Sequence, residues 1–133
     1  MTTVGRRRLI AVGLTVATVG AGLAVRFVLR RGAASDVAGD GLYAILIYLI
    51  VVFLAPRARP AVAAVVAGLL CVAIELFQLT GLPVAWAATF PPSALVLGTG
   101  FDPRDIVVYV AAVVIAALVD AASGARMRQP PAR

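Results

Sequence analysis

Four long apolar segments alternate with short polar stretches along the chain. They run from Leu9 to Val25, from Gly41 to Ala55, from Ala61 to about Leu82 and from about Pro103 to Ser123. A helix needs about 20 apolar residues to cross the hydrocarbon core of a bilayer. Because the second segment is short for a span, we place the start of its helix earlier, near Ser35 or Asp36. The pattern predicts transmembrane helices at about 9–29, 36–55, 61–82 and 103–123, followed by a tail at 124–133.

The stretch between the third and fourth predicted helices, residues 83–102, is too apolar for an ordinary loop. Prolines and glycines interrupt it at Pro91, Pro92, Gly98 and Gly100. Irregular backbone at membrane depth is tolerated only where it is buried in protein or lines a cavity, and Trp86 suits the membrane interface. We predict a connector that is non-helical or lies along the interface.

Composition places most of the surface in lipid. The chain of 133 residues is 62% hydrophobic and only 14% charged, and its mean hydropathy is +1.04. A water-soluble domain would not tolerate these values. We therefore predict an all-α, integral membrane four-helix bundle that forms a single domain over residues 1–133.

The same composition narrows the available chemistry. The chain has no histidine and one cysteine, which excludes Ser-His-Asp catalysis, Cys-His catalysis and thiolate zinc sites. The net charge of +6 comes from arginine alone, but no basic stripe with interleaved aromatic residues suggests nucleic-acid binding. We expect no cofactor, no metal and no nucleic-acid partner. Membrane lipids are the expected partners, with a homo-oligomer left open.

The arginines predict the orientation of the bundle, because cytoplasmic loops are enriched in positive charge. With four spans and the N-terminus inside, eight arginines are cytoplasmic and four are outside. The inner set is Arg6, Arg7, Arg8, Arg57, Arg59, Arg126, Arg128 and Arg133, and the outer set is Arg26, Arg30, Arg31 and Arg104. We therefore predict that both termini and the tail at 124–133 are cytoplasmic.

Glu75 is the most informative polar residue, because an ionisable group inside a span is costly unless it is paired, protonated or beside water. Small residues lead along one face of its helix to Glu75 and Gln78, so this face should point into the bundle. The face comprises Ala64, Gly68, Cys71, Glu75, Gln78 and Leu82. Glu75 stands about 21 Å along its helix and Arg26 about 25 Å along the first, so the two could meet. Glu75 is then either a packing residue, paired with Arg26 or with a neighbouring helix, or a functional group. Tyr109 is either an interfacial anchor or a hydrogen-bond partner for Glu75.

The other carboxylates have a simpler interpretation as helix caps. Asp102 makes a good N-cap, Pro103 fits the first turn, and Asp105 stands where a capping box places its acid. Asp40 lies between two glycines and is typical of a turn that opens the second helix. Whether Asp102, Asp105 and Asp40 are more than caps is left open.

Three motifs resemble a family of small bacterial membrane proteins catalogued as domain of unknown function 2809. They are Gly-Asp-Gly-Leu-Tyr at 39–43, Ile-Glu-Leu-Phe-Gln-Leu at 74–79, and Leu-Gly-Thr-Gly-Phe at 97–101, the last leading to Asp105 and Tyr109. The chain is also distantly similar to the VanZ-like family, whose founding member is associated with glycopeptide-antibiotic resistance. These resemblances imply a multi-pass protein of the bacterial plasma membrane with no established activity.

Carried over by position, the family's polar residues match Asp40, Glu75, Gln78 and Asp105. An arginine that the resemblance leads us to expect in the connector has no counterpart between Pro83 and Gly98. Arg26 or Arg104 would have to take its place.

Three functions follow as hypotheses. The leading one is a non-enzymatic envelope protein whose outer polar site, built from Glu75, Gln78, Asp105, Asp40, Tyr109 and Arg26, binds a lipid or cell-wall-related headgroup. A second is a metal-assisted enzyme acting on a lipid-linked phosphate. A third is a small proton-coupled transporter that acts as a dimer, with Glu75 as the titrating group.

Overall fold

The computed structural model describes residues 2–126, and for residues 125 and 126 the backbone alone. It contains four long helices and two short ones: α1 (Thr3–Val28), α2 (Ala33–Leu54), α3 (Pro60–Gln78), α4 (Leu82–Thr89), α5 (Ser93–Leu97) and α6 (Pro103–Arg126). No strand occurs within the described residues. The all-α prediction is confirmed there, and most of the predicted tail lies outside them.

Two helices begin earlier than the hydrophobic pattern suggested. α1 includes the arginines at 6–8, because the hydroxyl of Thr2 caps the helix by accepting a hydrogen bond from the Gly5 N–H at 3.2 Å. α2 begins at Ala33, where the Ser35 hydroxyl accepts from the Gly32 N–H at 2.9 Å. Helix starts are decided by such local hydrogen bonds, whereas hydropathy marks only the part of the helix that lies in lipid.

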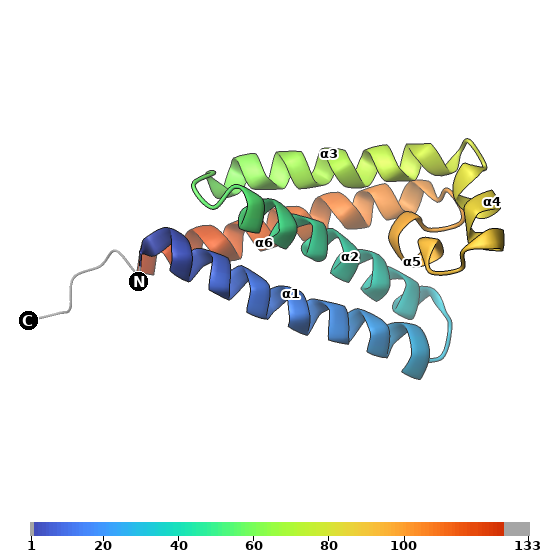
Figure 1. Cartoon of the computed structure of the whole chain (residues 1–133), viewed down its shortest axis with the longest axis horizontal. Helices are drawn as coiled ribbons and strands as arrows, with labels where there is room; N and C mark the ends of the chain where they lie inside the picture. The colour runs from blue at the N-terminus through green and yellow to red at the C-terminus, as the bar shows by residue number, and fades with distance from the viewer. Residues whose placement is uncertain (1, 127–133) are drawn as a thin grey trace, which may run out of the picture.

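The third helix ends four residues earlier than predicted. α3 ends at Gln78, and a turn through Gly81, with φ +73°, leads into α4. Together α4 and α5 account for much of the connector (Figure 1). The connector is therefore partly helical, and the alternative of a non-helical connector is wrong. Its position along the membrane interface remains a prediction.

α2 is the central helix of the bundle, and it packs against α1, α3 and α6 (Figure 1). α3 and α6 also pack against each other, whereas α1 packs its backbone only against α2. The core between α2, α3 and α6 contains many small residues, which let the helices approach closely. Its buried members include Ala44, Ala63, Ala67, Cys71, Ala112 and Val113. The predicted inward face of α3 is confirmed over Cys71, Glu75 and Gln78, while Leu82 is exposed.

Large apolar side chains cover the outside of the bundle. Leu14, Leu54, Leu69 and Leu118 are each more than half exposed, an arrangement that water would penalise. α1, α2, α3 and the Pro103–Gly124 part of α6 are long and apolar enough to cross a membrane. Length, composition and the apolar exterior together indicate a four-helix transmembrane protein.

The two ends of the bundle differ. We call the end that holds residues 79–102 the connector end, and the opposite one the N-terminal end. At the N-terminal end, Arg7 donates to the carbonyl oxygens of Pro56 and Ala58 at 2.8 and 2.9 Å, and its guanidinium pairs with Asp120 at 2.6 Å. Tyr48 donates to the same carboxylate at 2.8 Å. This network ties α1 to the α2–α3 turn and to α6, and the sequence did not indicate it.

Candidate functional site

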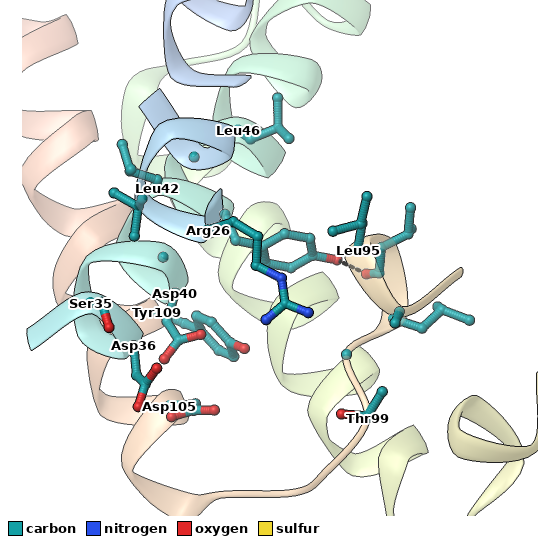
Figure 2. Close-up of a pocket in the computed structure, with 18 of the residues that line it drawn as sticks. Arg26, Ser35, Asp36, Asp40, Leu42, Leu46, Leu95, Thr99, Asp105 and Tyr109 are labelled. Carbon is teal, nitrogen blue, oxygen red and sulfur yellow. Dashed lines mark hydrogen bonds between the residues drawn. The ribbon is translucent and has the colours of Figure 1, made fainter. Parts of the chain in front are cut away.

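A cavity of about 670 Å³ opens at the connector end between α1, α2, the α5 segment and the start of α6. Figure 2 shows its wall, with α1 and α2 on one side and residues of the connector on the other. Ligand pockets in proteins commonly have volumes of about 300–1,000 Å³. The cavity is therefore large enough for a small molecule or a lipid headgroup.

Charged side chains of both signs line this cavity. They are Arg26, Arg31, Arg104, Asp36, Asp40, Asp102 and Asp105. Asp36, Asp40 and Asp105 gather on one side, while the Arg26 guanidinium reaches into the space between them and Leu95 (Figure 2). Among the described side chains, the ion pair within this set joins Arg104 to Asp102 at 3.5 Å. Arg26 and Arg31 form no ion pair there, and neither do Asp36, Asp40 and Asp105, so the cavity holds unpaired charges of both signs.

The deeper part of the cavity is apolar. Val19 and Leu23 of α1, together with Leu42 and Leu46 of α2, line the wall further from the connector end than the charged groups. Arg26 and Asp40 lie closer to the connector end on the same two helices. The cavity thus has a charged mouth and an apolar floor that extends toward the middle of the spans.

Glu75 is fully buried and does not line this cavity. Its Oε1 accepts a hydrogen bond from the Asp102 backbone N–H at 2.7 Å, and its Oε2 accepts from the Tyr109 hydroxyl at 3.3 Å. The predicted contact with Tyr109 is confirmed. Glu75 fastens the N-terminus of α6 to α3 and so holds one wall of the cavity in place.

Of the two alternatives for pairing Glu75, the one with Arg26 is wrong and the one with a neighbouring helix, α6, is confirmed. α1 packs its backbone against α2 alone, whereas Glu75 faces α6. The two side chains lie at similar positions along the bundle axis but point in different directions. Arg26 lies on the cavity side, free of any carboxylate partner among the described side chains.

The prediction of a helix cap is right for Asp102 and wrong for the capping box of Asp105. The carboxylate of Asp102 accepts from the Arg104 N–H at 2.9 Å, which confirms it as the N-cap of α6. Asp105 does not complete a capping box, because Glu75 already accepts from the Asp102 N–H. Its side chain instead lines the cavity, on the same side as Asp36 and Asp40 (Figure 2).

The prediction that Asp40 opens a helix is wrong, since it lies inside α2, two turns from the Ala33 start. Asp36 was not selected from the sequence, yet it stands one turn before Asp40 on the same helix and lines the same cavity. An i, i+4 spacing of two acids on a helix is the signal that could have found it.

Gln78 anchors the connector. Its Nε2 donates to the Leu97 carbonyl oxygen at 2.9 Å, which assigns the other amide atom, Oε1, as the acceptor. That Oε1 is buried and has no hydrogen-bond partner, although the Gln78 side chain lines the cavity. Buried polar atoms without partners are rare and costly, so Gln78 has an acceptor to offer.

Tyr43 is a second anchor, which was not selected as a site residue from the sequence. Its hydroxyl donates to the Val96 carbonyl oxygen at 2.6 Å. Its ring also packs against that of Tyr109, with the ring centroids 6.2 Å apart. Tyr43 and Gln78 therefore hold residues 96 and 97 against α2 and α3, where they close the connector side of the cavity.

The acidic cluster does not have the form of a complete metal site. Among the described residues, no group of three or more His, Cys, Asp or Glu side chains has the geometry to hold a metal ion. The side chains of Asp36, Asp40 and Asp105 form an acidic group on one side of the cavity (Figure 2).

Comparison with known families gives a match over most of the chain. A family described as "Protein of unknown function (DUF2809)" matches residues 29–113. The matched region contains Asp36, Asp40, Glu75, Gln78 and Asp105, whereas Arg26 and the α1 wall precede it. No curated protein and no solved structure matches the chain.

Proposed function

The chain belongs to the DUF2809 family of proteins of unknown function, and we propose that it is a non-enzymatic membrane protein that binds the polar headgroup of an amphiphile at its connector end. The observation that carries this proposal is the cavity with a charged mouth and an apolar floor. An amphiphile has the same division, because its headgroup needs charged or polar partners and its chain needs apolar ones.

The proposed ligand is a membrane lipid or a lipid-linked, cell-wall-related headgroup. The mouth lies at an end of the membrane-spanning helices, where lipid headgroups also lie. α1 packs its backbone only against α2, so a chain can reach the floor from the side of α1 without crossing the core. The arginines at the mouth suit a phosphate, with which guanidinium groups form bidentate hydrogen bonds.

We further propose that the connector end faces outward in a bacterial plasma membrane, with both termini in the cytoplasm. The distribution of arginine supports this orientation, because Arg6–Arg8, Arg57 and Arg59 all lie at the N-terminal end. A distant relation to the VanZ-like family is part of the same proposal. It rests on the Glu75-x-x-Gln78 motif followed by Asp105 near the start of the next long helix.

The two other functions gain no support from the geometry. Glu75, the titrating group of the transporter hypothesis, is fully buried and does not line the cavity. For the metal-assisted enzyme, the described residues contain no cluster of three metal-ligating side chains. Both remain untested predictions, and headgroup binding is the function that the cavity favours.

Replacing Arg26 by glutamine tests the proposal. Arg26 reaches into the cavity (Figure 2), and a hydrogen bond to a charged group contributes about 1.5–3 kcal/mol. The affinity of the purified protein for a phosphate-containing lipid should therefore fall about tenfold, as measured by lipid titration with native mass spectrometry.

Arg30→Gln is the matched control, because it removes the same charge four residues further along the chain and Arg30 does not line the cavity. It should leave the affinity within about twofold of the native value. Equal losses in Arg26→Gln and Arg30→Gln would show that the lipid responds to net charge alone, which contradicts the proposal.

A further inference from the structure

The acidic side of the cavity indicates which class of headgroup it accepts. Asp40 and Asp105 come from different helices, α2 and α6, and both line the cavity, where they lie on the same side (Figure 2). Two carboxylates so placed repel each other unless a proton or a cation lies between them. No arginine of the cavity pairs with either one among the described side chains.

Gln78 provides a second, independent observation that points to a ligand. Its side chain is 9% exposed, it lines the same cavity, and its Oε1 has no hydrogen-bond partner. Nε2 donates one of its hydrogens to the Leu97 carbonyl, which leaves Oε1 as the unused acceptor of Gln78. Gly98 makes this arrangement possible, since a Cβ at that position would lie 2.5 Å from Nε2.

The carboxylates of the acidic side therefore offer acceptors, while the basic side offers the donors of Arg26 and Arg31. A primary ammonium group has three N–H donors and no acceptor, so it complements the acidic side. A phosphate complements the arginines. A purely anionic headgroup would leave the negative charges of Asp40 and Asp105 without a counter-charge. A quaternary ammonium would supply positive charge without N–H donors.

We propose that the cavity selects a zwitterionic amphiphile, with a primary ammonium group held on the acidic side by Asp40 and Asp105 and a phosphate held by Arg26 and Arg31. This inference rests on the proposed function, because it names the headgroup of the same site. A phosphoethanolamine lipid is the simplest molecule with this chemistry.

The test compares lipids that share the same acyl chains and differ in the headgroup. Delipidated protein in detergent is titrated with phosphatidylethanolamine, its N-acetyl derivative, phosphatidylcholine and phosphatidylglycerol, and bound lipid is measured by native mass spectrometry. Phosphatidylethanolamine should bind about tenfold more tightly than each of the others, because only it carries both a phosphate and a primary ammonium. This comparison needs no variant, so it does not depend on the folding of one.

The variants Asp40→Asn and Asp105→Asn locate the selectivity. Each should reduce the preference for phosphatidylethanolamine over its N-acetyl derivative to about twofold or less, since the substitution removes the negative charge and one of the two acceptor oxygens that face the ammonium. Asp120→Asn removes the same charge at the N-terminal end and should keep the full preference. If Asp120→Asn also loses it, the preference reflects net charge and the inference fails.

The outcomes separate this inference from the proposed function. Equal affinity for all four lipids, or tighter binding of phosphatidylglycerol, would overturn the proposed selection of a zwitterionic headgroup, while the cavity remains a lipid site. Binding of no lipid at all would overturn both. Preference for phosphatidylethanolamine that depends on Asp40 and Asp105 would support both.

Discussion

Replacing Glu75 by alanine is expected to lower the free energy of unfolding by about 3 kcal/mol, one of the two largest effects predicted for this chain. The substitution leaves the Asp102 N–H and the Tyr109 hydroxyl without their acceptors. Each buried donor without a partner costs about 1–3 kcal/mol, and the empty volume adds to this. Unfolding of the purified protein in mixed micelles, followed by circular dichroism, measures the difference.

Glu75→Gln is the matched comparison, because the side chain keeps its size and retains an oxygen for the Asp102 N–H. We expect it to lose about 1 kcal/mol or less. Since Glu75 does not line the cavity, folded Glu75→Gln protein should bind lipid with native affinity. A folded Glu75→Gln protein that binds no lipid would contradict the positioning role and restore Glu75 as a direct ligand group.

Replacing Gly98 by alanine should cost about 2–3 kcal/mol, the second of the two largest effects. Gly98 has φ +65° and ψ −172°, a region of backbone conformation that is essentially restricted to glycine. The new Cβ would also lie 2.5 Å from Gln78 Nε2 and 3.2 Å from Cδ, so the Gln78–Leu97 hydrogen bond would have to break. The same unfolding measurement in mixed micelles reports the loss.

Gly100→Ala is the control for this effect, because a Cβ there meets nothing within 4 Å. It lies in the same connector, two residues away, and should change the free energy of unfolding by less than about 0.5 kcal/mol. Equal effects of the two substitutions would mean that the connector does not depend on the close approach of Gly98 to Gln78.

The four long helices could be predicted from sequence because hydropathy and length record the same physical requirement, the thickness of the bilayer. The turn at Gly81 between α3 and α4 could not be predicted, because one glycine with positive φ redirects the chain within an apolar region. The early start of α1 was missed for a related reason. Its N-cap at Thr2 lies outside the apolar segment.

Most polar residues of the site were recognised from sequence, but among their partners only the contact of Glu75 with Tyr109 was predicted. The rise per residue gives the positions of Glu75 and Arg26 along the bundle axis. It does not indicate which helices are neighbours. Because α1 packs its backbone only on α2, Arg26 does not pair with Glu75, which contacts α6 instead. The same limit applies to Arg7 and Asp120, which are 113 positions apart and meet at the N-terminal end.

The measurement that tests the cavity most directly is lipid binding to a variant in which the cavity is filled. Gly22 of α1 lines the cavity, and a Cβ added there would meet nothing within 4 Å, so Gly22→Phe can place a ring inside without displacing the backbone. Gly20→Phe is the control, because Gly20 has the same free space two residues away but does not line the cavity.

We predict that native mass spectrometry will find bound lipid on the native protein and on Gly20→Phe, and a loss of about tenfold or more in affinity for Gly22→Phe. Unchanged lipid binding by folded Gly22→Phe protein would contradict the proposed site, because the ligand would then bind elsewhere than in this cavity.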